Sequence, residues 1–325
     1  MEYYLSVEQK TFSIQKNWVS SCQSHFFIKK LNKISSNDKA QKEGYMSDNL
    51  LNYILNKIRD LPPLPESTHK ILQIAGNNAS SAKDLAKVLE KDLSLTTKVL
   101  KLVNSSFYGF SREISTISQA VVYLGFNTIK SLVLTASSYD TLNKDVVSYE
   151  LEKGMLWKHS IACASCSRLI AKEIKYSDPE EAYIAGLIHD IGKLMIDQYA
   201  NNLFKLILEK VTTDAISFDK AEKEVLGFDH PEIGSKIAQK WNFPLSLVES
   251  ISYHHQPENA TNHKELTYIV HLANTITAMA GIGIGNDSLQ YNFQPNTLDI
   301  LQLKEENVQN YIIQLSEIIN KDIAS

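Results

Sequence analysis

Arginine is scarce in this chain of 325 residues, which contains only Arg59, Arg112 and Arg168. Arginine is the side chain that binds phosphate through two parallel hydrogen bonds, so its scarcity argues against a large phosphate-reading surface. A formal net charge of -4, from 33 basic and 37 acidic side chains, supplies no positive field for nucleic acid or anionic lipid. We therefore expect neither nucleic acid nor a membrane among its partners.

Cysteine is also scarce, and the three residues Cys22, Cys163 and Cys166 are too few for a disulfide framework. The first four residues, Met-Glu-Tyr-Tyr, do not begin the apolar core of a signal peptide. A long stretch without charged side chains, residues 268–285, contains a histidine, an asparagine and several glycines, and is too polar to span a membrane. These features predict a cytoplasmic protein.

The apolar residues recur with a helical period, and no useful length of the sequence alternates as a strand would. Helix start signals stand at Ser81 to Asp84, Ser94, Thr116 to Gln119, Asp178-Pro179 and Asp229 to Glu232. The first half therefore predicts a bundle of short helices. The second half begins with a long helix over about 149–174, and the next helix carries His189 and Asp190.

We divide the chain into an N-terminal extension, two helical halves, and a terminal loop with an amphipathic helix. These parts are residues 1–45, 46–145, 146–283 and 284–325. The extension ends in a polar stretch directly before Met46, so either Met46 is the true start or the extension forms a short helix around residues 18–31. The terminal helix has an apolar face that could dock on the body of the protein or on a second copy.

The adjacent His189-Asp190 pair, inside an apolar run, is the most informative feature of the sequence. An imidazole nitrogen beside a carboxylate oxygen is a ready pair of metal ligands, and burying an ionised Asp without a partner is costly. Either a metal ion or a hydrogen-bond network must therefore satisfy Asp190. Lys193 follows closely, where it could hold a phosphate, pair with Asp190 or end in solvent.

Five of the nine histidines stand where a helical bundle could bring them together. They are His159, His189, His230, His254 and His255. One such residue alone is more often an ordinary core or surface histidine, but the set together with Asp190 favours a metal pocket. His159, Cys163 and Cys166 also share one helix face, which admits a small zinc site, although small core residues are the plainer interpretation of the cysteines.

Dense landmarks over about residues 50–280 resemble the HDOD family, the HD-related output domain of bacterial signalling proteins. They include Leu61-Pro62-Pro63-Leu64-Pro65, Phe107-Tyr108-Gly109, Ile117-Ser118-Gln119-Ala120-Val121, Trp157-Lys158-His159-Ser160, the His189-Asp190 run, His230-Pro231-Glu232-Ile233-Gly234 and His254-His255. The resemblance implies an all-α fold, in which an N-terminal helical bundle subdomain packs with a C-terminal subdomain shaped like an HD phosphohydrolase.

The resemblance also implies a ligand set. HD hydrolases bind metal with a first His, the His-Asp pair and a later Asp, which correspond to His159, His189, Asp190 and Asn274 here. Asn274 departs from that pattern, because an amide oxygen coordinates without negative charge and would hold a divalent ion more weakly. The related HD-GYP phosphodiesterases of cyclic di-GMP add a second metal through histidines that resemble His230, His254 and His255. Their Gly-Tyr-Pro loop is absent after the double histidine here, which argues against that substrate.

HDOD members are generally taken as non-catalytic signalling modules. Our first hypothesis is therefore a stand-alone module without turnover, whose partners are signalling proteins or a small nucleotide ligand. The alternative is a metal-dependent phosphohydrolase or phosphodiesterase of a nucleotide or cyclic nucleotide, with Asp190 and Lys193 as catalytic residues. The implied cofactor is a divalent transition metal such as Fe, Mn, Zn or Ni. A third hypothesis is a nucleotide-binding or protein-binding adaptor that uses the N-terminal bundle. We also expect that the terminal helix could form a homodimer contact.

Overall fold

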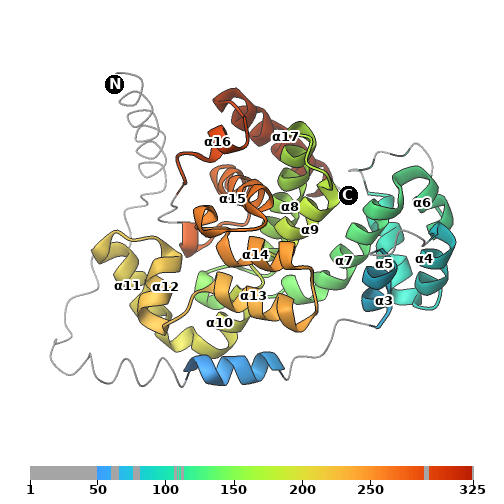
Figure 1. Cartoon of the computed structure of the whole chain (residues 1–325). Coiled ribbons are helices and arrows are strands. Elements are labelled where there is room, and N and C mark those ends of the chain that lie inside the picture. The colour runs from blue at the N-terminus through green and yellow to red at the C-terminus, as the bar shows by residue number, and fades with distance from the viewer. Residues whose placement is uncertain are drawn as a thin grey trace. The chain divides into compact units, whose positions relative to one another are not determined.

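The computed structural model describes residues 50–59, 66–75, 81–105, 108, 110, 113–288 and 293–323. Every regular element in these residues is a helix, which confirms the predicted all-α fold (Figure 1). Residues 46–325 form one compact unit. The expectation for residues 1–45 lies outside the described residues, and the boundaries at 145 and 283 stay predictions. None of the helices in the described part is long and apolar enough to cross a membrane.

The first half contains α3 (Glu66–Ala75), α4 (Ala82–Leu89), α5 (Leu93–Val103), α6 (Ile117–Leu124) and α7 (Phe126–Leu142). The predicted start signals hold for α4, where Ser81 and Asp84 form a capping box, and for α6, where Thr116 caps the helix. The prediction for Ser94 is wrong. Asp92 caps α5 instead, because its carboxylate accepts a hydrogen bond from the backbone N–H of Leu95 at 3.0 Å.

The second half supplies the helices that build the site. They are α8 (Met155–Glu173), α9 (Pro179–Ile188), α10 (Gly192–Ala200), α11 (Phe204–Asp214), α12 (Phe218–Leu226), α13 (His230–Lys240), α14 (Leu245–Tyr253) and α15 (Lys264–Met279). The long helix begins later than predicted, at Met155 rather than about residue 149. Gly154 adopts a φ of 84° directly before it, and a short 3-10 helix (Val147–Tyr149) precedes that turn.

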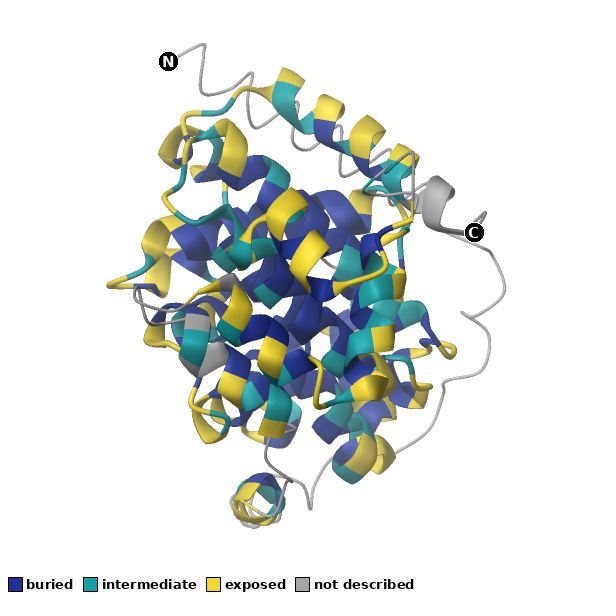
Figure 2. Cartoon of the chain, turned by 90° about the vertical axis from the view of Figure 1, so that its right-hand side faces the viewer, coloured by how far each residue is buried: buried dark blue, intermediate teal, exposed yellow. Residues whose placement is uncertain are grey.

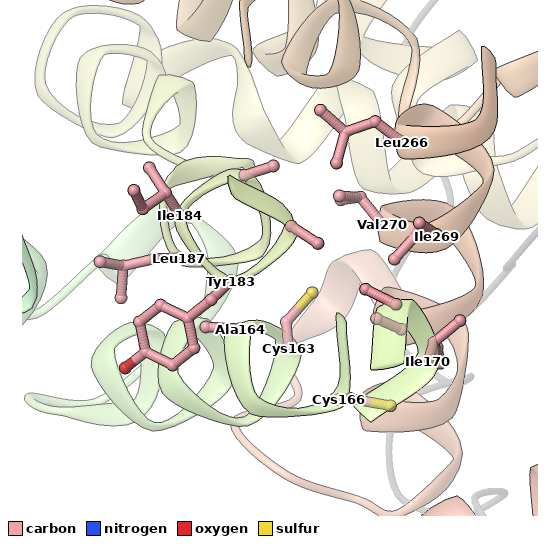
Figure 3. Packing of buried hydrophobic residues seen from close by; sticks show 14 of the residues in the cluster. Cys163, Ala164, Cys166, Ile170, Tyr183, Ile184, Leu187, Leu266, Ile269 and Val270 are labelled. Atoms are coloured by element: carbon pink, nitrogen blue, oxygen red, sulfur yellow. The ribbon is translucent and has the colours of Figure 1, made fainter. Parts of the chain in front are cut away.

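The core of the second half lies where α8 packs along α9 and α15 (Figure 3). Gly186 permits the close approach of α9 to α8, since a Cβ there would lie 2.9 Å from the backbone oxygen of Cys163. Cys163 and Cys166 are free and buried in this core, as the plainer interpretation predicts. Buried residues line the inner faces of the helices, and exposed residues occupy their outer faces (Figure 2).

The terminal segment contains α16 (Thr297–Ile300) and α17 (Glu305–Ile323). α17 packs on α8 and α15, and Tyr311 and Leu315 on its apolar face are buried in the same core. Of the two docking possibilities for this helix, the structure therefore shows the body of the protein.

Candidate metal centre

The His189-Asp190 pair lies in the turn between α9 and α10 rather than within a helix. α9 begins where the Asp178 carboxylate accepts the backbone N–H groups of Glu180 and Glu181, and it ends at Ile188. α10 then begins at Gly192, where a Cβ would lie 2.0 Å from the backbone oxygen of His230. This glycine therefore allows α10 and α13 to cross closely, which brings Asp190 to His230.

Asp190 is the centre of the site, because four imidazoles converge on its carboxylate. Its Oδ2 lies 3.3 Å from His189 Nε2 and 3.6 Å from His159 Nε2. Its Oδ1 lies 3.4 Å from His230 Nε2 and 3.7 Å from His254 Nε2. Each oxygen thus faces a different pair of histidines.

Two groups of candidate ligands share this carboxylate. We call His159, His189, Asp190 and Asn274 the Asn274 group, and Asp190, His230, His254 and His255 the His255 group. In the Asn274 group the ligand atoms of the two histidines and Asp190 lie within 4.8 Å of one another, and in the His255 group all four ligand atoms do. Asn274 Oδ1 lies 3.0 Å from His159 Nε2, and His255 Nε2 lies 3.1 Å from His230 Nε2. The structure thus brings all seven predicted residues together.

The hydrogen bonds of the rings show that this cluster fits a cation. The Nδ1–H of His189 donates to the backbone oxygen of Gly186 at 2.8 Å, and that of His254 donates to Ile251 at the same distance. In a ring that carries its proton on Nδ1 alone, Nε2 is an acceptor, and in both histidines it faces the acceptor oxygens of Asp190. Both Nε2 atoms and Asp190 Oδ1 are buried without a hydrogen-bond partner. Acceptors buried against one another are costly unless a proton or a metal ion lies between them.

The spacing of the ligand atoms agrees with that interpretation. Two atoms that each lie about 2.1 Å from one ion, at angles of about 90° to 120°, are roughly 3.0 to 3.6 Å apart. The neighbouring ligand atoms of both groups are 3.0 to 3.7 Å apart. A set rich in imidazole suits Zn, Fe or Ni better than Ca or Mg. Such an ion, when bound, polarises a phosphoryl oxygen and lowers the pKa of water.

The charges of the site favour metal binding in most of its members. Burial alone would raise the pKa of Asp190, but His189 and Lys193 hold it well below its usual range. Burial, followed by the neighbouring histidines, holds the pKa of His254 and of His255 well below the usual value, so both rings stay neutral. His189 and His230 differ. Burial alone would lower the pKa of both rings, but Asp190 raises that of His189 well above its usual value, and Glu222 raises that of His230 to about 10. A metal must therefore displace a proton from each of these two rings.

Glu222 stabilises the His255 group by a hydrogen bond to the ring nitrogen of His230 that faces away from Asp190. This residue was not predicted from the sequence. Its Oε2 accepts the Nδ1–H of His230 at 2.7 Å, and its Oε1 accepts the hydroxyl of Tyr149 at 2.5 Å. This carboxylate fixes the ring of His230 and raises the basicity of its Nε2. A signal was present: Glu222 stands four residues from Phe218 and from Leu226, on the apolar face of α12.

Lys193 pairs with carboxylates, which is one of the three options that the sequence left open. Its Nζ lies 2.5 Å from Asp190 Oδ2 and 2.6 Å from Asp287 Oδ2. The side chain is only 3% exposed. Burial alone would lower the pKa of Lys193, but Asp190 and Asp287 outweigh it and raise the pKa. Asp287 was not foreseen from the sequence, because it follows the glycine-rich stretch after α15 as an ordinary loop residue.

Access to the two groups differs. His159 is 5% exposed and Asn274 is 3% exposed, and the remaining ligands of the Asn274 group are still less accessible. In the His255 group, His255 is only half-buried and lines a surface cavity of about 530 Å³. Lys220, Lys223 and Glu224 line the same cavity. The His255 group is thus the one that this cavity reaches.

The chain is similar to proteins of a known family. The model of the HDOD domain matches residues 61–257, which is more than half of the chain. The chain belongs to the HDOD family. The motifs that carried the resemblance lie almost entirely within that match.

Individual relatives of this HDOD protein support the same fold. A candidate phosphohydrolase from Shewanella amazonensis is 28% identical, with a TM-score of 0.65 over 83% of this chain and 95% of that one. A candidate signal transduction protein from Marinobacter aquaeolei is 22% identical, with a TM-score of 0.69 over 86% of this chain and 65% of that one. An uncharacterised protein from Treponema pallidum is 28% identical over 68% of this chain. This chain spans 43% of the length of that relative.

Proposed function

We propose that this HDOD protein is a metal-binding signal-transduction module that works without turnover. The observation that carries this proposal is the cluster of six candidate ligands around Asp190, with buried acceptor atoms that a bound metal ion would satisfy. The same burial argues against catalysis. A phosphoester has to reach the ions directly, yet only His255 lies beside the surface cavity.

A metal held in this way would act on the structure of the protein. The ligands come from α8, α13, α15 and the turns after α9 and α14, so a bound ion would join helices that are far apart in the sequence. Loss or gain of the metal would change how firmly these helices are held together. A partner protein would respond to that change, or a small nucleotide ligand would be coupled to it. The likeness to the candidate signal transduction protein from Marinobacter aquaeolei, at 22% identity, is a likeness of fold.

The test combines metal analysis with an activity assay. The protein is purified without chelator and without a nickel resin, and its Fe, Mn, Ni, Co and Zn content is measured by mass spectrometry. Hydrolysis is then measured across a panel of nucleotides and cyclic nucleotides, with His189→Ala as the control. We expect bound metal and no turnover above the control. Absence of metal would overturn the metal centre, and turnover above the control would overturn the non-catalytic role.

A second candidate function is a metal-dependent phosphohydrolase. Lys193 favours it, because an ammonium beside the shared carboxylate stands where it could neutralise a phosphate. The 28% identity to the candidate phosphohydrolase from Shewanella amazonensis adds support. In this case Asp190 would hold the ions. The ammonium of Lys193 would move away from Asp287 and bind the phosphate of the substrate. Turnover after metal reconstitution that is lost in both His189→Ala and Lys193→Met would establish this function.

A further inference from the structure

Lys193 places a positive charge where a metal ion would need a negative one. Its ammonium lies 2.5 Å from Asp190 Oδ2, the oxygen that also faces His159 and His189. A cation at that distance cancels much of the attraction that Asp190 offers to a metal, and the effect is strong in a buried site. Metal binding therefore requires a second anion that holds the ammonium of Lys193.

Asp287 is that second anion. Its Oδ2 accepts a hydrogen bond from Lys193 Nζ at 2.6 Å. Its Oδ1 is buried and has no hydrogen-bond partner. The carboxylate thus has capacity to take a larger share of the ammonium when a metal engages Asp190.

The segment before Asp287 fixes its position. The Nδ1 of His159 lies 3.1 Å from the backbone oxygen of Ile282, to which it can donate. A Cβ at Gly283 would lie 2.4 Å from the backbone oxygen of Met155, and one at Gly285 would lie 2.2 Å from that of Tyr149. The backbone therefore passes in close contact with the helices around the site, and it presents Asp287 to Lys193 at a defined place.

We propose that Asp287 is a positioning residue of the metal centre, which holds the ammonium of Lys193 so that the charge of Asp190 is available to metal ions. Asp287 thereby supplies, through Lys193, the negative charge that Asn274 does not bring to its group. This inference rests on the proposed metal binding, and it adds a residue that lies outside both groups of candidate ligands.

A double-mutant cycle on metal affinity tests the proposal. The proteins are the wild type, Asp287→Asn, Lys193→Met and the double variant, with Asp299→Asn on α16 as a control for loss of an exposed carboxylate. Zn²⁺ affinity is measured by competition with a chromophoric chelator. Circular dichroism and thermal unfolding of each metal-free protein confirm that it is folded.

We expect Asp287→Asn to weaken Zn²⁺ binding by about 10-fold, the scale of outer-shell substitutions. Lys193→Met should strengthen binding, since it removes the competing charge. In the Lys193→Met background, Asp287→Asn should have no further effect, and Asp299→Asn should match the wild type. Lys193→Met also removes the contact with Asp190, but that loss is common to the single and the double variant, so the cycle isolates the coupling between Asp287 and Lys193.

Two results would overturn this inference alone. One is an unchanged affinity in Asp287→Asn, and the other is an equal loss in the presence and absence of Lys193, which would mean that Asp287 acts directly or through the fold. A folded wild type that binds no Zn²⁺ would overturn the proposed function and this inference together. The wild-type measurement therefore separates the two failures.

Discussion

The two ligand groups share Asp190 but differ in charge, support and access. The His255 group has three imidazoles, a carboxylate behind His230 and a cavity beside His255. The Asn274 group has two imidazoles and a neutral amide, and its ligands are almost fully buried. Similar geometry in the two groups therefore does not imply equal metal affinity, because charge and outer-shell hydrogen bonds also contribute. We expect the His255 group to bind metal more tightly.

The largest effect on metal affinity should come from removing Asp190, the ligand that the two groups share. Asp190→Asn deletes the one charged ligand of both groups, so metal affinity should fall by more than about 100-fold for each ion, beyond the range of outer-shell changes. Metal content after purification and dialysis measures this. Retention of either ion would show that the groups do not depend on the shared carboxylate.

Acid should destabilise the packing of His271 against the His255 group. The Nδ1–H of His271 donates to the backbone oxygen of His254 at 2.8 Å, and burial lowers the pKa of His271 to about 4 from 6.5. Because the pKa of His271 is lower in the folded than in the unfolded protein, its neutral ring contributes to the free energy of unfolding. That contribution is complete above pH 6.5 and is lost as the pH falls toward 4. The loss amounts to about 3 kcal/mol.

Urea unfolding with a chelator present, at pH 7.5 and at pH 4.5, measures this loss. His271→Gln should reduce the difference between the two pH values relative to the wild type. An identical pH dependence in both proteins would contradict the assignment.

Removing the carboxylate of Glu222, which lies outside both groups, should weaken metal binding in the His255 group alone. Glu222→Gln keeps the shape of the side chain but removes the charge that fixes and activates His230. Affinity of the His255 group should fall by about 10- to 100-fold, and that of the Asn274 group should stay unchanged. Calorimetric titration with Zn²⁺ resolves the two. Equal weakening of both sites would show that Glu222 acts through the fold.

Restoring a carboxylate should make the metal affinities of the two groups more alike. Asn274→Asp adds one negative charge beside His159 and should strengthen binding to the Asn274 group by about 10-fold, or roughly 1.4 kcal/mol. Asn262→Asp, at an exposed position, is a matched control for the added charge. No gain, or an equal gain in the control, would mean that the amide is not what limits this group.

The candidate ligands could be named from the sequence, partly from helix signals and partly from the resemblance to the HDOD family. The structure brings them together, and metal binding stays a prediction. Asp229 caps α13 and thereby positions His230, and the end of α14 places His254 beside His255. The helical period also predicts the all-α fold. Three helix predictions were wrong. Asp92 takes the cap of α5, Gly154 delays the start of α8, and α9 ends at Ile188, so that His189 and Asp190 lie in a turn.

The supporting residues could not be predicted in the same way. Glu222 and Asp287 act through contacts with His230 and Lys193, which stand 8 and 94 residues away in the chain. Nothing in the local pattern shows which buried carboxylate meets which base. Only the crossing of α10 and α13, and the packing of the segment after α15, bring these pairs together.

The most direct test of the account is a stepwise Zn²⁺ titration of the metal-free wild type beside His254→Ala and His189→Ala. We predict two binding steps in the wild type, with the tighter step lost in His254→Ala and the weaker step lost in His189→Ala. A folded wild type that binds no Zn²⁺, or a tighter step that is lost in His189→Ala instead, would contradict the account.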